Sequence, residues 1–178
     1  MPKDFVVTFV ARDRPGLVDL MSEVVTAHGG NWLESRMAHL AEKFAGIVRV
    51  QAPDDRAEAM ADALAALSNH GFRVTVEEAR AEEKAEEKAG AGKVLSLEIL
   101  GPDQPGIVHE ISHCLAQHKV SVEELETSLE DAPFAGGKLF RAALTLHLPA
   151  GLSEDSLADA LEEIGSAVMV DVTFGAPN

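Results

Sequence analysis

Apolar residues occur along the chain in strand-like runs and helical stripes that follow one another in a fixed order. Residues 5–10 form a run rich in Val and Phe, which predicts a buried strand. The next segment carries one apolar stripe at helical spacing, which predicts an amphipathic helix; the stripe consists of Leu17, Leu20, Met21, Val24 and Val25. The glycine pair at 29–30 follows and predicts the end of that helix.

The next fifty residues predict two more strands, a second helix and a last strand. Strands are expected at 32–40 and 47–52, with the turn between them at 42–46. A second helix starts near Pro53 and carries an apolar stripe, and 73–77 alternates as a strand.

The second half of the chain predicts the same order of elements. Ser153 precedes the second helix of this half and has Ser156 three residues later, which fits an N-terminal cap without the Glu of a full capping box. The expected elements are 94–100, 107–117, 122–130, 139–148, 154–164 and 168–174.

An internal repeat explains this order. The pattern Asp-x-Pro-Gly-(Leu/Ile)-Val occurs at 13–18 and again at 103–108, an offset of 90 residues that also aligns His28 with His118. The offset grows later, so the second copy carries an insertion of about six residues near 133–138. We therefore predict a duplicated chain with domains at 1–78 and 93–178, joined by a charged Ala/Glu/Lys linker at 79–92 that acts as a partly helical, semi-rigid spacer.

Each copy reads βαββαβ, which predicts an α+β, ferredoxin-like domain. Four antiparallel strands would carry two helices on one face. The other face of such a sheet needs a cover. We expect that cover from the other copy or from a second chain in a homodimer.

Composition and charge exclude several classes of protein. The 178 residues contain no apolar run long enough to span a membrane and no export signal at the start, so a cytoplasmic protein is expected. Cys114 is the single cysteine, which excludes a disulfide scaffold and a cysteine-rich zinc site within one chain. The formal net charge of −15 argues against direct binding of nucleic acid, because the phosphate backbone requires a basic surface.

The Asp-x-Pro-Gly loop, which joins the first strand to the first helix of each copy, is the sharpest candidate for chemistry. Glycine lets the backbone approach a partner closely, and the free N–H groups at a helix start can hold an anion such as a carboxylate. Asp13 and Asp103 are alternatively caps of the helix that follows. The simplest alternative is a turn with no ligand at all.

Other polar residues favour structural roles. The segment 109–113 matches H-E-x-x-H, the zinc metalloprotease pattern, but the first copy has Asp19 and Glu23 at the two histidine positions. This indicates a solvent-exposed face, and no metal is expected. His28 and His118 fall at helix C-termini, where an imidazole interacts favourably with the helix dipole. Cys114 lies on an apolar face and is expected in the core.

The repeated loop and the helix that follows it carry a family resemblance. The segment 13–18, followed by an amphipathic helix that closes at 27–31, resembles an ACT domain, and 103–108 begins a second one. Two such domains with little else are similar to the glycine cleavage system transcriptional repressor family. The first copy also resembles the amino-terminal sensing domains of formyltetrahydrofolate deformylase and phosphoserine phosphatase, but no catalytic domain follows it here.

The resemblance implies a regulatory protein without catalytic residues or cofactors. It would bind a small amino acid, of the glycine or serine class, where ACT domains meet, and would regulate a protein partner such as a DNA-binding activator. An interaction scaffold without ligand and a zinc-dependent hydrolase through 109–113 remain as alternatives. The ligand-binding residues that the resemblance implies are Asp13, Arg14, Pro15, Gly16, Leu17, Val18, Asn31 and Trp32 in the first copy and Asp103, Gln104, Pro105, Gly106, Ile107, Val108, Ser121 and Val122 in the second.

Overall fold

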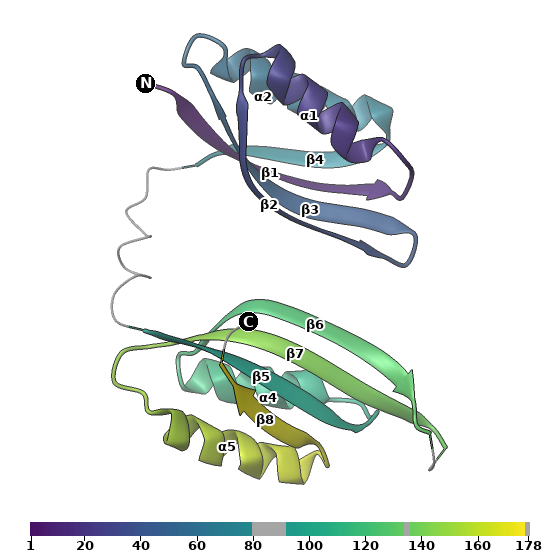
Figure 1. Cartoon of the computed structure of the whole chain (residues 1–178), viewed down its shortest axis with the longest axis vertical. Coiled ribbons are helices and arrows are strands. Elements are labelled where there is room, and N and C mark those ends of the chain that lie inside the picture. The colour runs from purple at the N-terminus through teal and green to yellow at the C-terminus, as the bar shows by residue number, and fades with distance from the viewer. Residues whose placement is uncertain (80–91, 134–135, 177–178) are drawn as a thin grey trace. The chain divides into compact units, whose positions relative to one another are not determined.

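The computed structural model describes residues 1–79, 92–133 and 136–176 (Figure 1). The chain divides into two compact units, Met1–Glu83 and Lys84–Asn178. The linker predicted at 79–92 lies outside the described residues except for its two end positions. No helix in the described part of the chain has the length and apolar character needed to cross a membrane.

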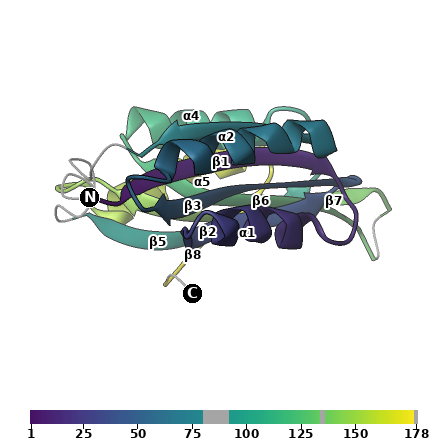
Figure 2. The same cartoon turned by 90° about the horizontal axis from the view of Figure 1, so that it is seen from above.

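The first unit is a four-stranded antiparallel sheet with its helices on one face. Its strand order is β2-β3-β1-β4, so β3 lies between β1 and β2 as in a split βαβ arrangement. Helices α1 and α2 contact each other, and Figure 2 looks down on the face that they cover. The elements are β1 (Lys3–Arg12), α1 (Leu17–Ala27), β2 (Asn31–Leu40), β3 (Lys43–Ala52), α2 (Ala57–Ala65), the 3₁₀ helix η1 (Ala66–His70) and β4 (Phe72–Glu78).

The second unit repeats the same topology. Its strand order is β6-β7-β5-β8, again with antiparallel neighbours. The α+β, ferredoxin-like fold expected from the sequence is therefore confirmed in both halves. The elements are β5 (Lys93–Pro102), α4 (Ile107–Gln117), β6 (Ser121–Asp131), β7 (Lys138–Leu148), α5 (Glu154–Ala167) and β8 (Asp171–Gly175).

Each unit has its own apolar core between the sheet and the helices. In β1, every second side chain from Phe5 to Ala11 is buried, because alternate residues of a strand face the same side. Met21 of α1 and Met60 of α2 are almost fully buried against that face. The second unit has a separate core of the same design.

The hairpin between β2 and β3 is tighter than the sequence indicated. The predicted turn at 42–46 is wrong, because β3 already begins at Lys43 and pairs along its whole length with β1. The turn consists of Ala41 and Glu42 alone, which adopt φ of 47° and 62°. Two positive φ values are typical of a two-residue hairpin, but no Asn-Gly or Asp-Gly pair signals it here. In the second unit, residues 132–137 separate β6 from β7, which accounts for the insertion.

The end of the second unit differs from expectation in a similar way. Helix α5 continues to Ala167, and β8 begins only at Asp171, so the predicted strand at 168–174 starts too early. Val168 ends the helix and Met169 takes φ of 56°, a turn conformation that a methionine does not signal. The expected cap is confirmed, since Ser153 Oγ accepts a hydrogen bond of 3.2 Å from the Ser156 N–H.

Candidate functional site

The Asp-x-Pro-Gly loops place unpaired backbone donors at the start of a helix in each unit. Gly16 is the N-cap of α1 with φ of 88°, and Gly106 is the N-cap of α4 with φ of 97°. The first helical hydrogen bond of α1 runs from the Leu20 N–H to the Gly16 carbonyl, so the N–H groups of residues 17–19 have no acceptor within the helix. A helix start of this kind attracts anions, as the sequence suggested.

The aspartates of these loops do not cap the helices. The N-caps Gly16 and Gly106 are followed by helices without a side-chain cap hydrogen bond, so the alternative that Asp13 and Asp103 cap them is wrong. Both aspartates lie three residues before the cap, where their N–H groups bond to the hairpin carbonyls of Glu42 and Lys138.

The residue after each aspartate attaches its loop to the end of the second helix. Arg14 Nη2 donates to the His70 carbonyl at 2.8 Å, and Gln104 Nε2 donates to the Val168 carbonyl. The two units thus repeat this contact with different side chains. Arg14 and Gln104, both predicted as ligand-binding residues, therefore have a structural role in holding the loops.

Asn31 and Trp32 lie at the other end of α1 from the loop at 13–16. The eleven residues of α1 span about 16 Å at 1.5 Å per residue. Ser121 and Val122 are separated from their loop by α4 in the same way. Within a single unit, the structure therefore does not bring the two halves of the predicted site together.

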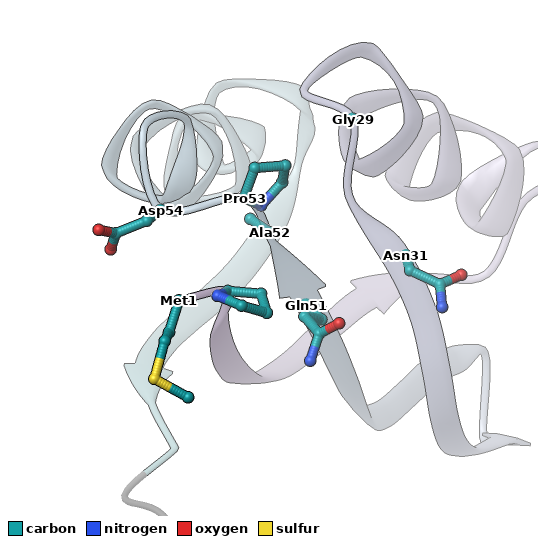
Figure 3. Close-up of a pocket in the computed structure, with 8 residues that line it drawn as sticks. Met1, Gly29, Asn31, Gln51, Ala52, Pro53 and Asp54 are labelled. Atoms are coloured by element: carbon teal, nitrogen blue, oxygen red, sulfur yellow. The ribbon is translucent and has the colours of Figure 1, made fainter.

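A shallow pocket of about 360 Å³ opens at the Asn31 end of the first unit (Figure 3). Asn31 and Gln51 are cross-strand partners in β2 and β3, so their side chains lie next to each other on the same face of the sheet. Gln51 is absent from the sequence prediction, because only the strand register pairs it with Asn31. The pocket is lined by Met1, Pro2, Gly29, Asn31, Gln51, Ala52, Pro53 and Asp54.

A hydrogen-bonded carboxylate holds Gln51 in place. Asp4 Oδ1 accepts a bond of 2.7 Å from Gln51 Nε2, while Asp4 Oδ2 accepts bonds of 3.1 and 2.7 Å from Arg49 Nε and Nη2. These bonds favour the charged carboxylate and lower the pKa of Asp4, with the larger contribution from Gln51 and the next from Arg49. The three residues form a connected polar network beside the pocket.

The second unit lacks this network. Its strand register puts Val94 opposite His147 and Ser96 opposite Thr145, where the first unit has Asp4 opposite Gln51 and Val6 opposite Arg49. Ser121 pairs with His147, where Asn31 pairs with Gln51. The two ends therefore present different chemistry to a ligand.

A second, larger hollow of about 690 Å³ lies along β1, β3 and β4 of the first unit. Val10 and Ile47, which line it, are 42% and 55% exposed on the sheet. Its lining is mainly apolar, with Arg73 the single charged side chain among the lining residues. This hollow has the character of a contact surface more than of a small-molecule site.

The histidines of the H-E-x-x-H segment lie on the surface. The rings of His109 and His113 stack with centroids 5.9 Å apart, and both residues are exposed, as is Glu110. Within the described ranges, no group of three His, Cys, Asp or Glu side chains is placed to hold a metal ion.

The remaining candidates have structural partners. His28 Nδ1 lies 2.8 Å from the Val24 carbonyl and His118 Nδ1 lies 2.9 Å from the Cys114 carbonyl, so both rings bond to the ends of their helices. Cys114 is 4% exposed, and burial raises the pKa of its thiol, with the nearby charge of Glu163 adding to the effect. It is a core residue, as the sequence predicted.

The fold and the two loops define a protein of two ferredoxin-like domains in tandem. The sequence model of the ACT domain matches residues 3–77 and 93–135. The chain therefore belongs to the ACT domain family, a family of regulatory domains.

Comparison with solved structures finds several that are similar to this chain. An unknown protein from Galdieria sulphuraria has 29% sequence identity and a TM-score of 0.86, with 100% of both chains covered. A protein described as "putative glycine cleavage system transcriptional repressor" has 16% identity and a TM-score of 0.68 over 98% of this chain and 97% of that one. A formyltetrahydrofolate deformylase from Pseudomonas putida KT2440 has 20% identity and a TM-score of 0.41, over 48% of this chain and 29% of that one. No curated protein matches the chain.

Proposed function

We propose that this ACT-domain protein senses a small amino acid of the glycine or serine class and regulates a partner protein in response. The observation that carries the proposal is the repeated loop, which presents free N–H groups at a helix start in both units. Those groups suit the carboxylate of an amino acid. The protein would act by binding, without catalysis or cofactor.

The ligand would lie between two ACT domains. The loop at 13–18 and the pair Asn31 and Trp32 are about 16 Å apart along α1, too far to hold one small amino acid. A site that uses both would combine the loop of one ACT domain with the start of the second strand of another. The second domain comes from the same chain or from its partner in a homodimer.

The partner would be a protein, with a DNA-binding activator as the specific proposal. The net charge of −15 supports contact with a protein over direct contact with nucleic acid. Regulation of transcription by this route is what the resemblance to the repressor family implies.

An interaction scaffold without ligand is the second candidate. Val10 and Ile47 on the sheet of the first unit favour it, because apolar residues on the face of a sheet that its own helices do not cover are a common basis for protein association. In that case a partner would bind with the same affinity whether or not amino acids are present.

A thermal-shift screen of the full chain against free amino acids tests the proposal. A ligand at 100 times its Kd adds roughly 2.7 kcal/mol to the free energy of unfolding, so we expect a rise in Tm of a few degrees with glycine or serine. Gly16→Val or Gly106→Val, whichever loop binds the carboxylate, should abolish that rise. Gly151→Val is the matched control, because Gly151 also has positive φ, 89°, and open space around it but lies outside both loops. No shift with any amino acid would leave the scaffold as the better account.

A further inference from the structure

Gln51 has a fixed orientation at the edge of the pocket. A carboxylate only accepts hydrogen bonds, so the amide end that faces Asp4 must be the NH₂ group, which donates at 2.7 Å. Arg49 binds the other carboxylate oxygen and keeps Asp4 charged and in place. The carbonyl oxygen Oε1 of Gln51 is consequently left as a hydrogen-bond acceptor.

That acceptor is available for a ligand. Among the described residues, neither Gln51 Oε1 nor the carboxamide of Asn31 has a hydrogen-bond partner. Figure 3 shows the two amide groups on neighbouring strands at the same side of the pocket. Gln51 Oε1 is thus an acceptor at the pocket, with the carboxamide of Asn31 on the neighbouring strand.

The acceptor groups at the pocket, more than a net charge, suit a cation. None of the eight lining residues has a basic side chain, and Asp54 adds a carboxylate to the lining. Arg49 balances the charge of Asp4, and Arg56 lies beside Gly29. The charged Asp4 lies directly behind Gln51 and polarises its amide. An ammonium group, which has three donors and no acceptor, matches this environment.

From these contacts we propose that the first unit recognises the ammonium group of the amino acid through Gln51 Oε1 and Asn31, with Asp4 as the positioning residue for Gln51. This assignment rests on the proposed amino-acid binding and specifies which residues bind the ammonium end of the ligand. The carboxylate of the ligand would bind the loop N–H groups of the other ACT domain at the interface. Because Val94, Thr145 and His147 replace the network in the second unit, the ammonium site exists once per chain.

Isothermal titration of the full chain with glycine and with glycolate, which has a hydroxyl in place of the amine, tests this assignment. The wild type should bind glycine at least tenfold more tightly than glycolate, with one site per chain. Gln51→Met keeps the length of the side chain and removes the acceptor. It should weaken glycine binding roughly tenfold or more, as expected for a hydrogen bond to a charged group, and weaken glycolate binding less, because a neutral hydroxyl donates a weaker hydrogen bond.

Two further variants separate recognition from folding. Asp4→Asn lets the Gln51 amide turn over and should weaken glycine binding less than Gln51→Met does, again with a smaller effect on glycolate. His147→Met, at the position in the second unit that corresponds to Gln51, should change neither affinity. Circular dichroism and Tm check that each variant is folded.

Each outcome bears on a different claim. If the wild type binds glycine and both Gln51→Met and Asp4→Asn bind it equally well, the role of Gln51 is overturned while the sensor proposal stands. Equal wild-type affinity for glycolate and glycine, or two sites per chain, also overturns it. Absence of amino-acid binding by the wild type overturns both proposals.

Discussion

Arg14 Nη2 donates a hydrogen bond of 2.8 Å to the carbonyl of His70, and so joins the loop before α1 to the end of the second helical segment. Gln104 makes the corresponding bond to Val168 in the second unit. The two contacts couple the position of the candidate carboxylate-binding loop to the packing of the helices. In both copies the variable residue of Asp-x-Pro-Gly is polar and makes this bond.

Arg14→Ala should destabilise the first unit modestly. It removes one hydrogen bond to a backbone carbonyl near the surface, so we expect a loss of about 1 kcal/mol in the free energy of unfolding. Thermal and urea denaturation measure it. Arg12→Ala, an exposed arginine at the end of β1, is the matched control and should have little effect. Equal stability of Arg14→Ala and wild type would show that the bond contributes nothing in solution.

Gly16→Ala should be destabilising for a conformational reason alone. An added Cβ meets nothing within 4 Å, but φ of 88° is unfavourable for a residue with a Cβ. We expect a loss of about 1–2 kcal/mol, and a smaller loss for Gly16→Asn, because asparagine tolerates this region better. Urea denaturation of both variants checks the order. A larger loss for Asn than for Ala would contradict this explanation.

Gly30→Ala should be destabilising for a steric reason. A Cβ at Gly30 would lie 2.7 Å from Met60 Sδ and 2.9 Å from the Gln51 carbonyl, both closer than van der Waals contact. We expect a loss of roughly 1–3 kcal/mol as α2 and β3 shift. The double variant Gly30→Ala with Met60→Ala tests the cause, since the added methyl group should then cost less than it does with Met60 present. Additive losses would assign the effect to the backbone instead.

Asp4 should make the stability of the first unit dependent on acid pH. Its pKa is lowered in the folded state, so the stabilisation is fully present above the unfolded value of about 3.9 and is lost as the pH falls through the lower folded value. Asp4→Asn should therefore be less stable than wild type at pH 7, and the difference should shrink toward pH 2. Urea denaturation across this range measures it. If the difference in stability between Asp4→Asn and wild type grew as the pH fell, the pKa of Asp4 would be raised in the folded state and not lowered.

Cys114 should resist thiol reagents in the folded protein. It is 4% exposed and burial raises the pKa of the thiol, so little thiolate is accessible near neutral pH. A chromogenic disulfide reagent should label it slowly in buffer and rapidly, with one equivalent, in denaturant. Rapid stoichiometric labelling of the native protein would show that α4 opens readily.

The repeat and the apolar pattern predicted most of the fold, and the failures occur at particular turns. Alternating burial in β1 and the stripes of α1 and α4 follow directly from side-chain periodicity. The hairpin at Ala41 and Glu42 and the end of α5 near Met169 were mispredicted, because residues with no turn preference adopt positive φ there. The pairing of β2 with β3 and the link from α5 to β8 impose those conformations, and local sequence does not encode them.

Only part of the candidate site could be predicted from the sequence. The loops were found because they occur twice, and the N-cap glycines need their positive φ in both copies. The polar network could not be predicted from the sequence. Asp4 lies on β1, 45 or more residues before Arg49 and Gln51 on β3, and the register of the two strands alone brings them together.

The sequence by itself determined that this chain contains two βαββαβ domains, that their cores lie under amphipathic helices and that a glycine loop opens each first helix, because these features depend on neighbours along the chain. Only the tertiary structure decided that the loop at 13–16 and Asn31 lie at opposite ends of α1, that Arg14 holds the loop to His70 and that Asp4 orients Gln51 beside Asn31. These relationships depend on strand register and helix packing, which bring together residues distant in sequence.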